Sequence, residues 1–421
     1  MFSLPRFAVR AILFSVASLA SAGQTLEISP ARIMADESTT IRARGLEPGE
    51  RVTIRGTLTD GLAQVWTSRA DFVADAQGVV DASMQAPAAG SYKEVSPMGL
   101  IWSMLPSAKH VSTYVAPRDP ESQSIEFELL RKGQSAAKAT LEQRFVAEGV
   151  QEIPVHEGPL RGIFYVPPGG ERHPGILVVG GSNGGVPRRP AAWLASHGFA
   201  ALALAYFRYE DLPPQLEDIP LEYFGMALEW MSRRPEIAGT RFGVTGTSRG
   251  GELALQLGSM YPRIAAVVAY VPANVRYAAC CRQDGGPAWL WQGRPLPYAV
   301  PRRGRLDAPP DSEIAVEKTQ GPILMISGQD DHLWRSWEMA DEVVSRLKRT
   351  HFAYSFENLK YRHAGHSAGR PEIIPAWHSD VRNPTSGRES DLGGSAAGDA
   401  ESSIDGIPKV LAFFKEALEG R

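Results

Sequence analysis

The sequence is poor in cysteine, and this limits the cross-links that it can form. Its two cysteines, Cys280 and Cys281, are neighbours in the chain. Adjacent Cα atoms lie about 3.8 Å apart, closer than the roughly 4.4–6.8 Å of ordinary disulfides. The pair therefore cannot form a normal disulfide staple, although a strained bridge between neighbours stays open. No spacing of cysteine and histidine predicts a zinc site.

Long apolar runs and net positive charge are also lacking. No segment after residue 22 approaches about 20 uninterrupted apolar residues, so we expect no stable membrane span. The formal net charge is −3, which excludes the overall basic character of a nucleic-acid-binding protein. We therefore expect a small-molecule partner and no nucleic acid, and the oligomeric state stays open.

Residues 1–22 have the pattern of an export signal. They carry Arg6 and Arg10 and no acid, continue with an apolar run, and close on the small residues Ala20-Ser21-Ala22. The run is too short to span about 30 Å of hydrocarbon as a helix. An amphipathic N-terminal helix is the alternative. We predict a signal peptide and an exported mature protein, periplasmic or secreted, whose net charge moves from −3 to −5 because two arginines are removed.

The mature chain of about 400 residues is too long for one typical core, so two domains are expected. Residues 23–150 read as short alternating strands separated by turn formers, which is typical of an immunoglobulin-like β-sandwich. Towards its end, residues 124–151 mix strand with a charged, helix-like pattern. Residues 151–421 alternate buried strands with helices, and this pattern predicts a doubly wound, mostly parallel sheet.

The C-terminal end of the second domain is expected to contain a long loop. Residues 381–403 are rich in Gly, Ser, Asp and Asn and have almost no apolar residue. This composition predicts a surface loop, disordered or acting as a lid. The following stretch, residues 408–418, is predicted to form a last covering helix.

The strongest chemical motif is Gly246-Thr247-Ser248-Arg249-Gly250. It lies between a buried strand and a helix, which is the context of a nucleophile elbow in the α/β-hydrolase fold. The alternative is a tight turn with a structural serine. The flanking strand and helix favour Ser248 as a nucleophile.

An activated serine needs a histidine base that is held by an acid, and in this fold the chain order is Ser, Asp or Glu, then His. The strand "ILMISG" ends just before Asp330 and Asp331, and the spacing Gly-x-x-Asp favours Asp331. His363 and His366 follow the next strand. We favour His366 because the preceding glycine lets its loop approach the elbow, and we expect His332 to be a pocket or surface residue.

Acyl transfer also needs an oxyanion hole. We expect one donor to be the backbone N–H of Arg249, the residue after the nucleophile. The glycine-rich segment "VVGGSNGG" follows an early strand, and its Ser182 is the candidate for the second donor. A dinucleotide-binding loop is the alternative for this segment, but it lacks the G-x-G-x-x-G spacing. We expect neither a cofactor nor a metal.

With these residues in view, most of the mature chain resembles the family of acyl-CoA thioesterases and bile acid-CoA:amino acid N-acyltransferases. The most specific segments are Tyr209–Pro213 and Gly328–His332. The resemblance implies an immunoglobulin-like domain followed by an α/β-hydrolase domain, and it implies a triad of Ser248, Asp331 and His366. Members that conjugate amino acids typically have cysteine as nucleophile, so serine here favours hydrolysis. The family's usual proline-rich stretch after the histidine is absent.

These observations predict a serine hydrolase of the acyl-CoA thioesterase type that works through an acyl-serine intermediate. Coenzyme A is intracellular, so the export signal leaves open an exported carboxylesterase that does not use it. An alternative of another class is a binding module in which the sandwich recognises a surface ligand and the hydrolase domain is catalytically relict. Five arginines could either bind the phosphates of coenzyme A or simply form a solvent-exposed surface: Arg188, Arg189, Arg302, Arg303 and Arg305. The aromatic segment Trp289–Trp291 is expected either to line the acyl pocket or to pack in the core.

Overall fold

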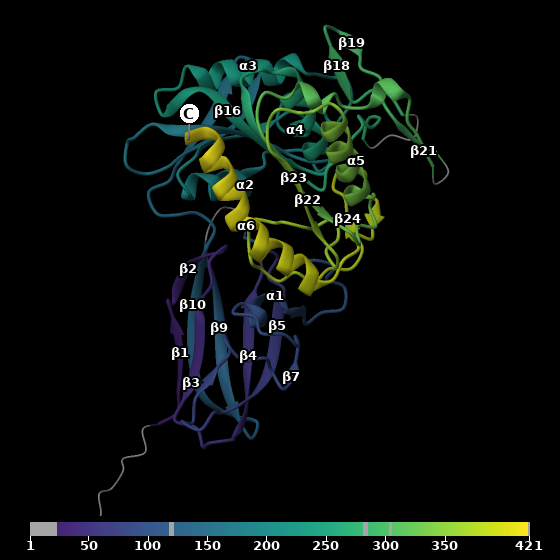
Figure 1. Ribbon diagram of the computed structural model, residues 1–421. Helices are drawn as coiled ribbons and strands as arrows, with labels where there is room; N and C mark the ends of the chain where they lie inside the picture. The colour runs from purple at the N-terminus through teal and green to yellow at the C-terminus, as the bar shows by residue number, and fades with distance from the viewer. Residues whose placement is uncertain (1–22, 118–121, 281–284, 303–304, 420–421) are drawn as a thin grey trace, which may run out of the picture.

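The computed structural model describes residues 23–117, 122–280, 285–302 and 305–419. The N-terminal strands form an elongated β-structure, and an α/β part with helices around its sheet lies at one end of it (Figure 1). The predicted signal peptide, residues 1–22, lies outside the described residues. Cys281 does too, so the strained bridge to Cys280 that the sequence left open lies outside the described part of the structure.

The N-terminal part consists of two sheets. The smaller sheet has the order β1 (Thr25–Ser29), β3 (Thr40–Arg44) and β6 (Val80–Asp81). The larger sheet has the order β2 (Arg32–Met34), β10 (Gln134–Arg144), β9 (Ser122–Arg131), β4 (Arg51–Thr59), β5 (Val65–Val73) and β7 (Ala89–Gly90), and β8 (Leu105–Pro106) also pairs with β5. The short helix α1 is Gly99–Trp102.

Strict alternation of apolar and polar residues builds this sandwich. In β4 and β5 every second residue is buried, as expected for strands with one face on a core. Ile41 of the smaller sheet and Ile54, Trp66 and Phe127 of the larger one belong to the same apolar cluster. The helix-like interpretation of residues 124–151 is wrong, because most of them form β9 and β10, two long antiparallel strands. Glu126 and Lys138 are exposed on these strands, whereas Glu128 is buried.

The second part is built on an eight-stranded sheet of the doubly wound type. Its order is β11 (Gln151–Glu157), β12 (Leu160–Val166), β14 (Ala200–Ala205), β13 (His173–Val179), β16 (Ile237–Thr247), β17 (Ile264–Tyr270), β22 (Ile323–Gly328) and β23 (Phe356–Tyr361). The pairings of β11 with β12 and of β12 with β14 are antiparallel, and all the others are parallel. The α/β-hydrolase fold predicted from the sequence is therefore confirmed.

Helices and short strands surround this sheet. The helices are α2 (Arg188–Ser196), α3 (Glu222–Ser232), α4 (Arg249–Met260), α5 (Ser336–Arg349) and α6 (Ala396–Glu419), with two 3₁₀ turns at Pro310–Ser312 and Val316–Lys318. The remaining short strands are β15 (Ile219–Pro220), β18 (Trp289–Trp291), β19 (Arg294–Pro295), β20 (Val300–Arg302), β21 (Arg305–Asp307), β24 (Val381–Arg382) and β25 (Glu389–Ser390). Among the described residues, no helix combines the length and the apolar character needed to cross a membrane.

The long loop predicted over residues 381–403 is only partly correct. A small hairpin, β24–β25, begins the segment, and α6 already starts at Ala396, well before residue 408. Asp399, Ser402 and Ser403 are buried in this helix. Their polar side chains make local and tertiary hydrogen bonds there, so a composition typical of a loop is compatible with a buried helix.

The two parts are joined by backbone hydrogen bonds around residues 373–376. Ile373 N–H donates to Ala35 O at 2.7 Å, and Ala376 N–H donates to Trp102 O at 3.0 Å. The buried Gln143 of β10 donates to Ile373 O at 3.1 Å. The segment that follows the predicted catalytic histidine is thus fixed to the sandwich.

Candidate active site

Ser248 lies at a sharp turn between β16 and α4. Its backbone has φ 61° and ψ −121°, a left-handed conformation that is uncommon outside glycine. Its N–H donates to Tyr270 O at 2.9 Å, and its carbonyl accepts the N–H of Glu252 in the first turn of α4. Strain of this kind places a serine side chain at the top of the sheet, as in a nucleophile elbow.

The glycines of the motif are required by close packing. A Cβ on Gly246 would lie 2.3 Å from Gly250 O, and one on Gly250 would lie 2.6 Å from Gly180 O. Such distances are far below van der Waals contact. The motif therefore lets the strand, the helix and the loop after β13 meet around Ser248.

Asp331 follows β22 and has a fully buried carboxylate. Its Oδ1 accepts the N–H groups of Leu333 and Trp334 at 3.1 and 3.2 Å, and its Oδ2 accepts the Ser336 hydroxyl at 2.7 Å. Several donors converge on this one carboxylate, and they fix its orientation.

His366 lies in the loop after β23, and its ring is almost completely buried. Its Nδ1 is in hydrogen-bond contact with Asp331 Oδ2 at 2.9 Å. The other nitrogen, Nε2, is buried and has no hydrogen-bond partner among the described residues. An acid that holds Nδ1 and leaves Nε2 available is the arrangement that a general base needs.

The other histidines and the other aspartate near the motif do not take part in the contact between Asp331 and His366. His332 is half exposed, and its ring bonds Asp391 at 2.7 Å and Asp330 at 3.0 Å. These two hydrogen bonds raise the pKa of His332 above its ordinary value. His363 is exposed. The structure therefore joins Asp331 to His366 and keeps Asp330 with the surface histidine.

The loop predicted to complete the oxyanion hole lies beside the elbow. A Cβ on Gly181 would be 3.5 Å from Ser248 Cβ. The next residue, Ser182, accepts hydrogen bonds from the β24–β25 hairpin: Asn383 donates to its hydroxyl at 3.0 Å and Thr385 to its carbonyl at 2.8 Å. The Arg249 backbone begins α4 directly after the nucleophile. Both predicted donors are thus carried by segments that adjoin Ser248.

Parallel strands explain why these residues meet. Ser248, Asp331 and His366 follow β16, β22 and β23, three parallel strands of the same sheet. The carboxyl ends of parallel strands lie at one edge, where sheets of this kind bind ligands.

Sequence comparisons place the chain among known proteins. Residues 36–157 match the family model of the acyl-CoA thioester hydrolase/BAAT N-terminal region, and residues 219–284 and 302–420 match the BAAT/acyl-CoA thioester hydrolase C-terminal model. The chain is 33% identical to acyl-coenzyme A thioesterase 6 of Mus musculus over 94% of its length and 97% of the relative's. It belongs to the acyl-CoA thioester hydrolase family.

Other relatives agree with this membership. Acyl-coenzyme A thioesterase 1 of Rattus norvegicus and the peroxisomal succinyl-coenzyme A thioesterase of Mus musculus are each 31% identical, with 94% of this chain and 97% of theirs covered. Among solved structures, a puromycin-hydrolysing peptidase of Mycobacterium tuberculosis is 12% identical with a TM-score of 0.44, covering 89% of this chain and 54% of that one. The two family models and the thioesterase relatives confirm the resemblance drawn from the sequence, and the chain is an enzyme of a hydrolytic family.

In this family member the side chain of Arg249 is buried behind the elbow. Its guanidinium donates to Ala278 O at 2.7 Å and to Tyr277 O at 3.0 Å. It lies 2.9 Å from the buried carboxylate of Glu252. Burial raises the pKa of Glu252, and Arg249 opposes that shift. The pair ties the residue after the nucleophile to the segment that follows β17.

Trp289, the first residue of the aromatic segment Trp289–Trp291, packs in the core. Trp289 is 1% exposed, and its indole N–H donates to Glu252 at 2.7 Å. Its ring contacts Tyr206 and Phe224. Of the two roles left open by the sequence, the structure supports core packing for Trp289.

Sequence reasoning missed Trp334, which lies next to the imidazole. Its ring meets His366 edge to face at 5.7 Å and stacks at a tilt on Tyr277 at 5.1 Å. Its indole N–H donates to Val271 O at 3.0 Å. The only sequence signal is its position three residues after Asp331.

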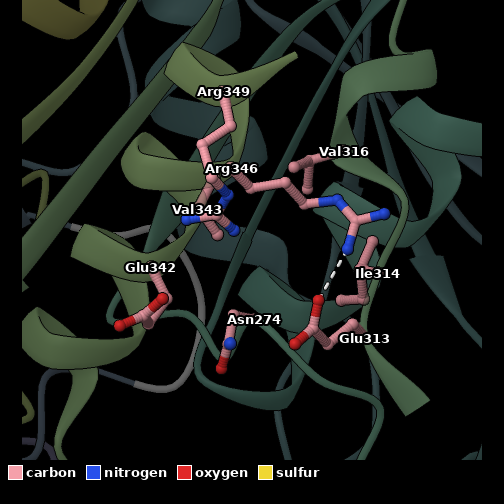
Figure 2. Close-up of a pocket in the computed structure, with 8 residues that line it drawn as sticks. All are labelled: Asn274, Glu313, Ile314, Val316, Glu342, Val343, Arg346 and Arg349. Atoms are coloured by element: carbon pink, nitrogen blue, oxygen red, sulfur yellow. Dashed lines mark hydrogen bonds and ion pairs between the residues drawn. The ribbon is translucent and has the colours of Figure 1, made fainter. Parts of the chain in front are cut away.

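A pocket beside α5 does not belong to this site. It is lined by Asn274, Glu313, Ile314, Val316, Glu342, Val343, Arg346 and Arg349 (Figure 2). Arg346 donates to Glu313 at 2.6 Å and to Glu317 at 2.6 and 2.9 Å. These bonds hold the pKa of Glu317 below its ordinary value. An arginine already paired with two carboxylates makes this pocket an ion-pair cluster.

Two of the arginines considered for phosphate binding have protein partners. Arg188 pairs with Glu152. Arg189 bonds Glu372 at 3.0 Å and stacks over the Phe145 ring. The side chains of Arg302, Arg303 and Arg305 lie outside the described part of the structure. Charge neutralisation by glutamate argues against a phosphate-binding role for the first two.

Proposed function

We propose that this enzyme hydrolyses acyl thioesters through an acyl-serine intermediate on Ser248. The observation that carries the proposal is the buried contact between His366 Nδ1 and Asp331 Oδ2, at the sheet edge where the strained Ser248 also lies. Members of the family named for acyl-CoA and succinyl-CoA thioesters support the substrate class.

The proposed reaction has two steps. His366 Nε2 takes the Ser248 proton while Oγ attacks the thioester carbonyl, and the proton then passes to the departing thiolate sulfur. Water, deprotonated by His366, attacks the acyl-serine, and His366 returns the proton to Ser248 Oγ as the fatty acid leaves. Asp331 holds the imidazole in one tautomer, and the backbone N–H groups of Arg249 and Ser182 stabilise the oxyanion in both steps.

The substrate is tested with two acyl donors of matched chain length. Purified mature protein should hydrolyse palmitoyl-CoA with a kcat/KM well above that for p-nitrophenyl palmitate, and both rates should disappear in Ser248→Ala. Hydrolysis is followed by release of free thiol and of p-nitrophenol. The proposal would be refuted if neither the thioester nor the ester were hydrolysed faster than by Ser248→Ala.

A second candidate is an exported carboxylesterase that does not use coenzyme A. The observation that favours it is the pairing of Arg188 and Arg189 with glutamates, which removes two cations that phosphates would need. Turnover of the ester together with no turnover of palmitoyl-CoA would select this candidate.

We further propose that the protein is exported to the periplasm or secreted. The charge, apolar run and small residues of residues 1–22 support this. When the full chain is produced in a bacterial host, N-terminal sequencing of the product should begin at Gly23. An Ala22→Phe variant should remain uncleaved, because the peptidase needs a small residue there. A full-length, cytoplasmic wild-type product would contradict the proposal.

A further inference from the structure

The loop that carries His366 is held by the residues that begin α6. Four of the hydrogen bonds between them are donated by backbone N–H groups: Ser395 N–H to His363 O at 2.9 Å, Gly365 N–H to Asp399 Oδ1 at 2.8 Å, His366 N–H to Leu392 O at 2.8 Å, and Gly369 N–H to Ser402 Oγ at 2.8 Å. The loop therefore does not orient the imidazole by itself. Its position depends on a helix more than 25 residues further along the chain.

Asp399 differs from the other residues that accept or donate these four hydrogen bonds. It supplies the only ionisable side chain among the four bonds, and it accepts the N–H of the residue directly before His366. The residue is 4% exposed, in the first turn of α6. Hydrogen bonds to a carboxylate are roughly twice as strong as neutral ones. Asp399 thus supplies the charge-assisted bond among these four, and it acts on the residue directly before the catalytic imidazole.

The surroundings leave the Gly365 backbone little freedom. A Cβ on Gly365 would lie 2.2 Å from Gly393 O, so the loop and the residues before α6 are in close backbone contact. The Gly365 N–H donates to the buried carboxylate of Asp399. If this acceptor were removed, the N–H would have to move to find another partner. Such a movement would carry the adjacent His366 with it.

Asp399 also lies close to a histidine whose backbone pairs with the sandwich. Its Oδ2 lies 3.4 Å from Nε2 of His378, whose side chain is 9% exposed. The backbone at His378 pairs with Thr113, and Ser379 N–H donates to Ser112 O at 2.8 Å. A path of direct contacts therefore runs from the N-terminal domain through His378 and Asp399 to the His366 loop.

We propose that Asp399 is a positioning residue for the hydrolase reaction. Its carboxylate holds the Gly365 N–H so that His366 keeps Nδ1 on Asp331 and leaves Nε2 free for proton transfer. The inference rests on the proposed function of Ser248, Asp331 and His366. It assigns no contact with substrate to Asp399.

Three substitutions test this role. Asp399→Ala removes the acceptor of the Gly365 N–H. Asp399→Ser removes it too, because the serine side chain is too short to replace Oδ1, but it keeps a polar residue in the first turn of α6. Asp399→Asn keeps a carbonyl oxygen for Gly365. A matched control, Ser402→Ala, removes a bond of the same length from the same helix to Gly369, three residues beyond His366.

We expect kcat to fall by about 10- to 100-fold in Asp399→Ala and Asp399→Ser, because a displacement of about 1 Å in a catalytic group can lower the rate by about 10²-fold. KM should change by less than about threefold, since Asp399 is assigned no contact with substrate. Asp399→Asn should restore kcat to within about threefold of wild type, and Ser402→Ala should stay in that range. Melting temperatures are measured for all four variants, and each assay is run well below them.

Two results would overturn the inference. One is wild-type kcat in folded Asp399→Ser. The other is a kcat in Asp399→Asn as low as in Asp399→Ser. The rate of fluorophosphonate labelling is measured in parallel because it needs the activated serine and no thioester. If wild type hydrolyses no thioester but is labelled, the substrate proposal fails, and the labelling rates of the variants still decide the role of Asp399.

Discussion

Replacement of Ser248 by alanine is expected to lower kcat/KM for the best acyl substrate by about 10⁴- to 10⁶-fold. The reason is that the acyl-enzyme route is lost, and only binding and oxyanion stabilisation remain. Alanine keeps the Cβ that already tolerates φ 61° at this position, so the elbow should not be further strained. Initial rates with palmitoyl-CoA measure the effect.

The control for this variant is Ser259→Ala, which removes a hydroxyl at the other end of α4. Among the described residues, that hydroxyl bonds Gln256, one turn earlier in the same helix. The control should stay within about twofold of wild type, and the melting temperature of both variants should be close to that of wild type. A Ser248→Ala enzyme that retains a tenth of the activity would contradict a nucleophilic role.

Asp331→Asn is expected to produce the second largest loss, about 10³- to 10⁴-fold in kcat. Asp331 Oδ2 accepts from both Ser336 and His366. An asparagine side chain has one acceptor oxygen, while Oδ1 and Oδ2 of the aspartate both receive donors. One donor must therefore face the amide NH₂, and the tautomer of His366 is no longer enforced.

Asp330→Asn is the matched control because it changes the adjacent carboxylate. Asp330 lies on the surface with His332 and the Gly394 N–H. We expect its kcat to remain within about threefold of wild type. A larger loss in Asp330→Asn than in Asp331→Asn would reverse the assignment of the acid.

The sequence predicted the elbow, and it favoured one aspartate and one histidine for the proposed triad. A glycine-flanked serine between a strand and a helix has few other structural meanings, and an acid and a histidine that follow parallel strands must lie at the same edge. The structure places Asp331 and His366 in contact there. What the sequence could not show was the environment within each pair, namely the burial of Asp331 and the exposure of His363.

Tertiary hydrogen bonds explain the features that the sequence did not predict. The start of α6 has the composition of a loop, yet Asp399 and Ser402 use their polar groups to bond the His366 loop. The role of Trp289 was ambiguous because a pocket wall and a core both require an apolar ring. It was decided by its hydrogen bond to Glu252, a partner distant in sequence.

The most direct test of the central claim is to identify the residue that becomes acylated. Wild-type enzyme is mixed with a long-chain acyl-CoA, quenched in acid within the first turnover, digested and analysed by mass spectrometry, with a fluorophosphonate adduct as the stable reference. The account predicts that both adducts lie on the peptide containing Ser248 and that both are absent from Ser248→Ala. An adduct on any other residue, or a Ser248→Ala enzyme that is still acylated and turns over, would contradict it.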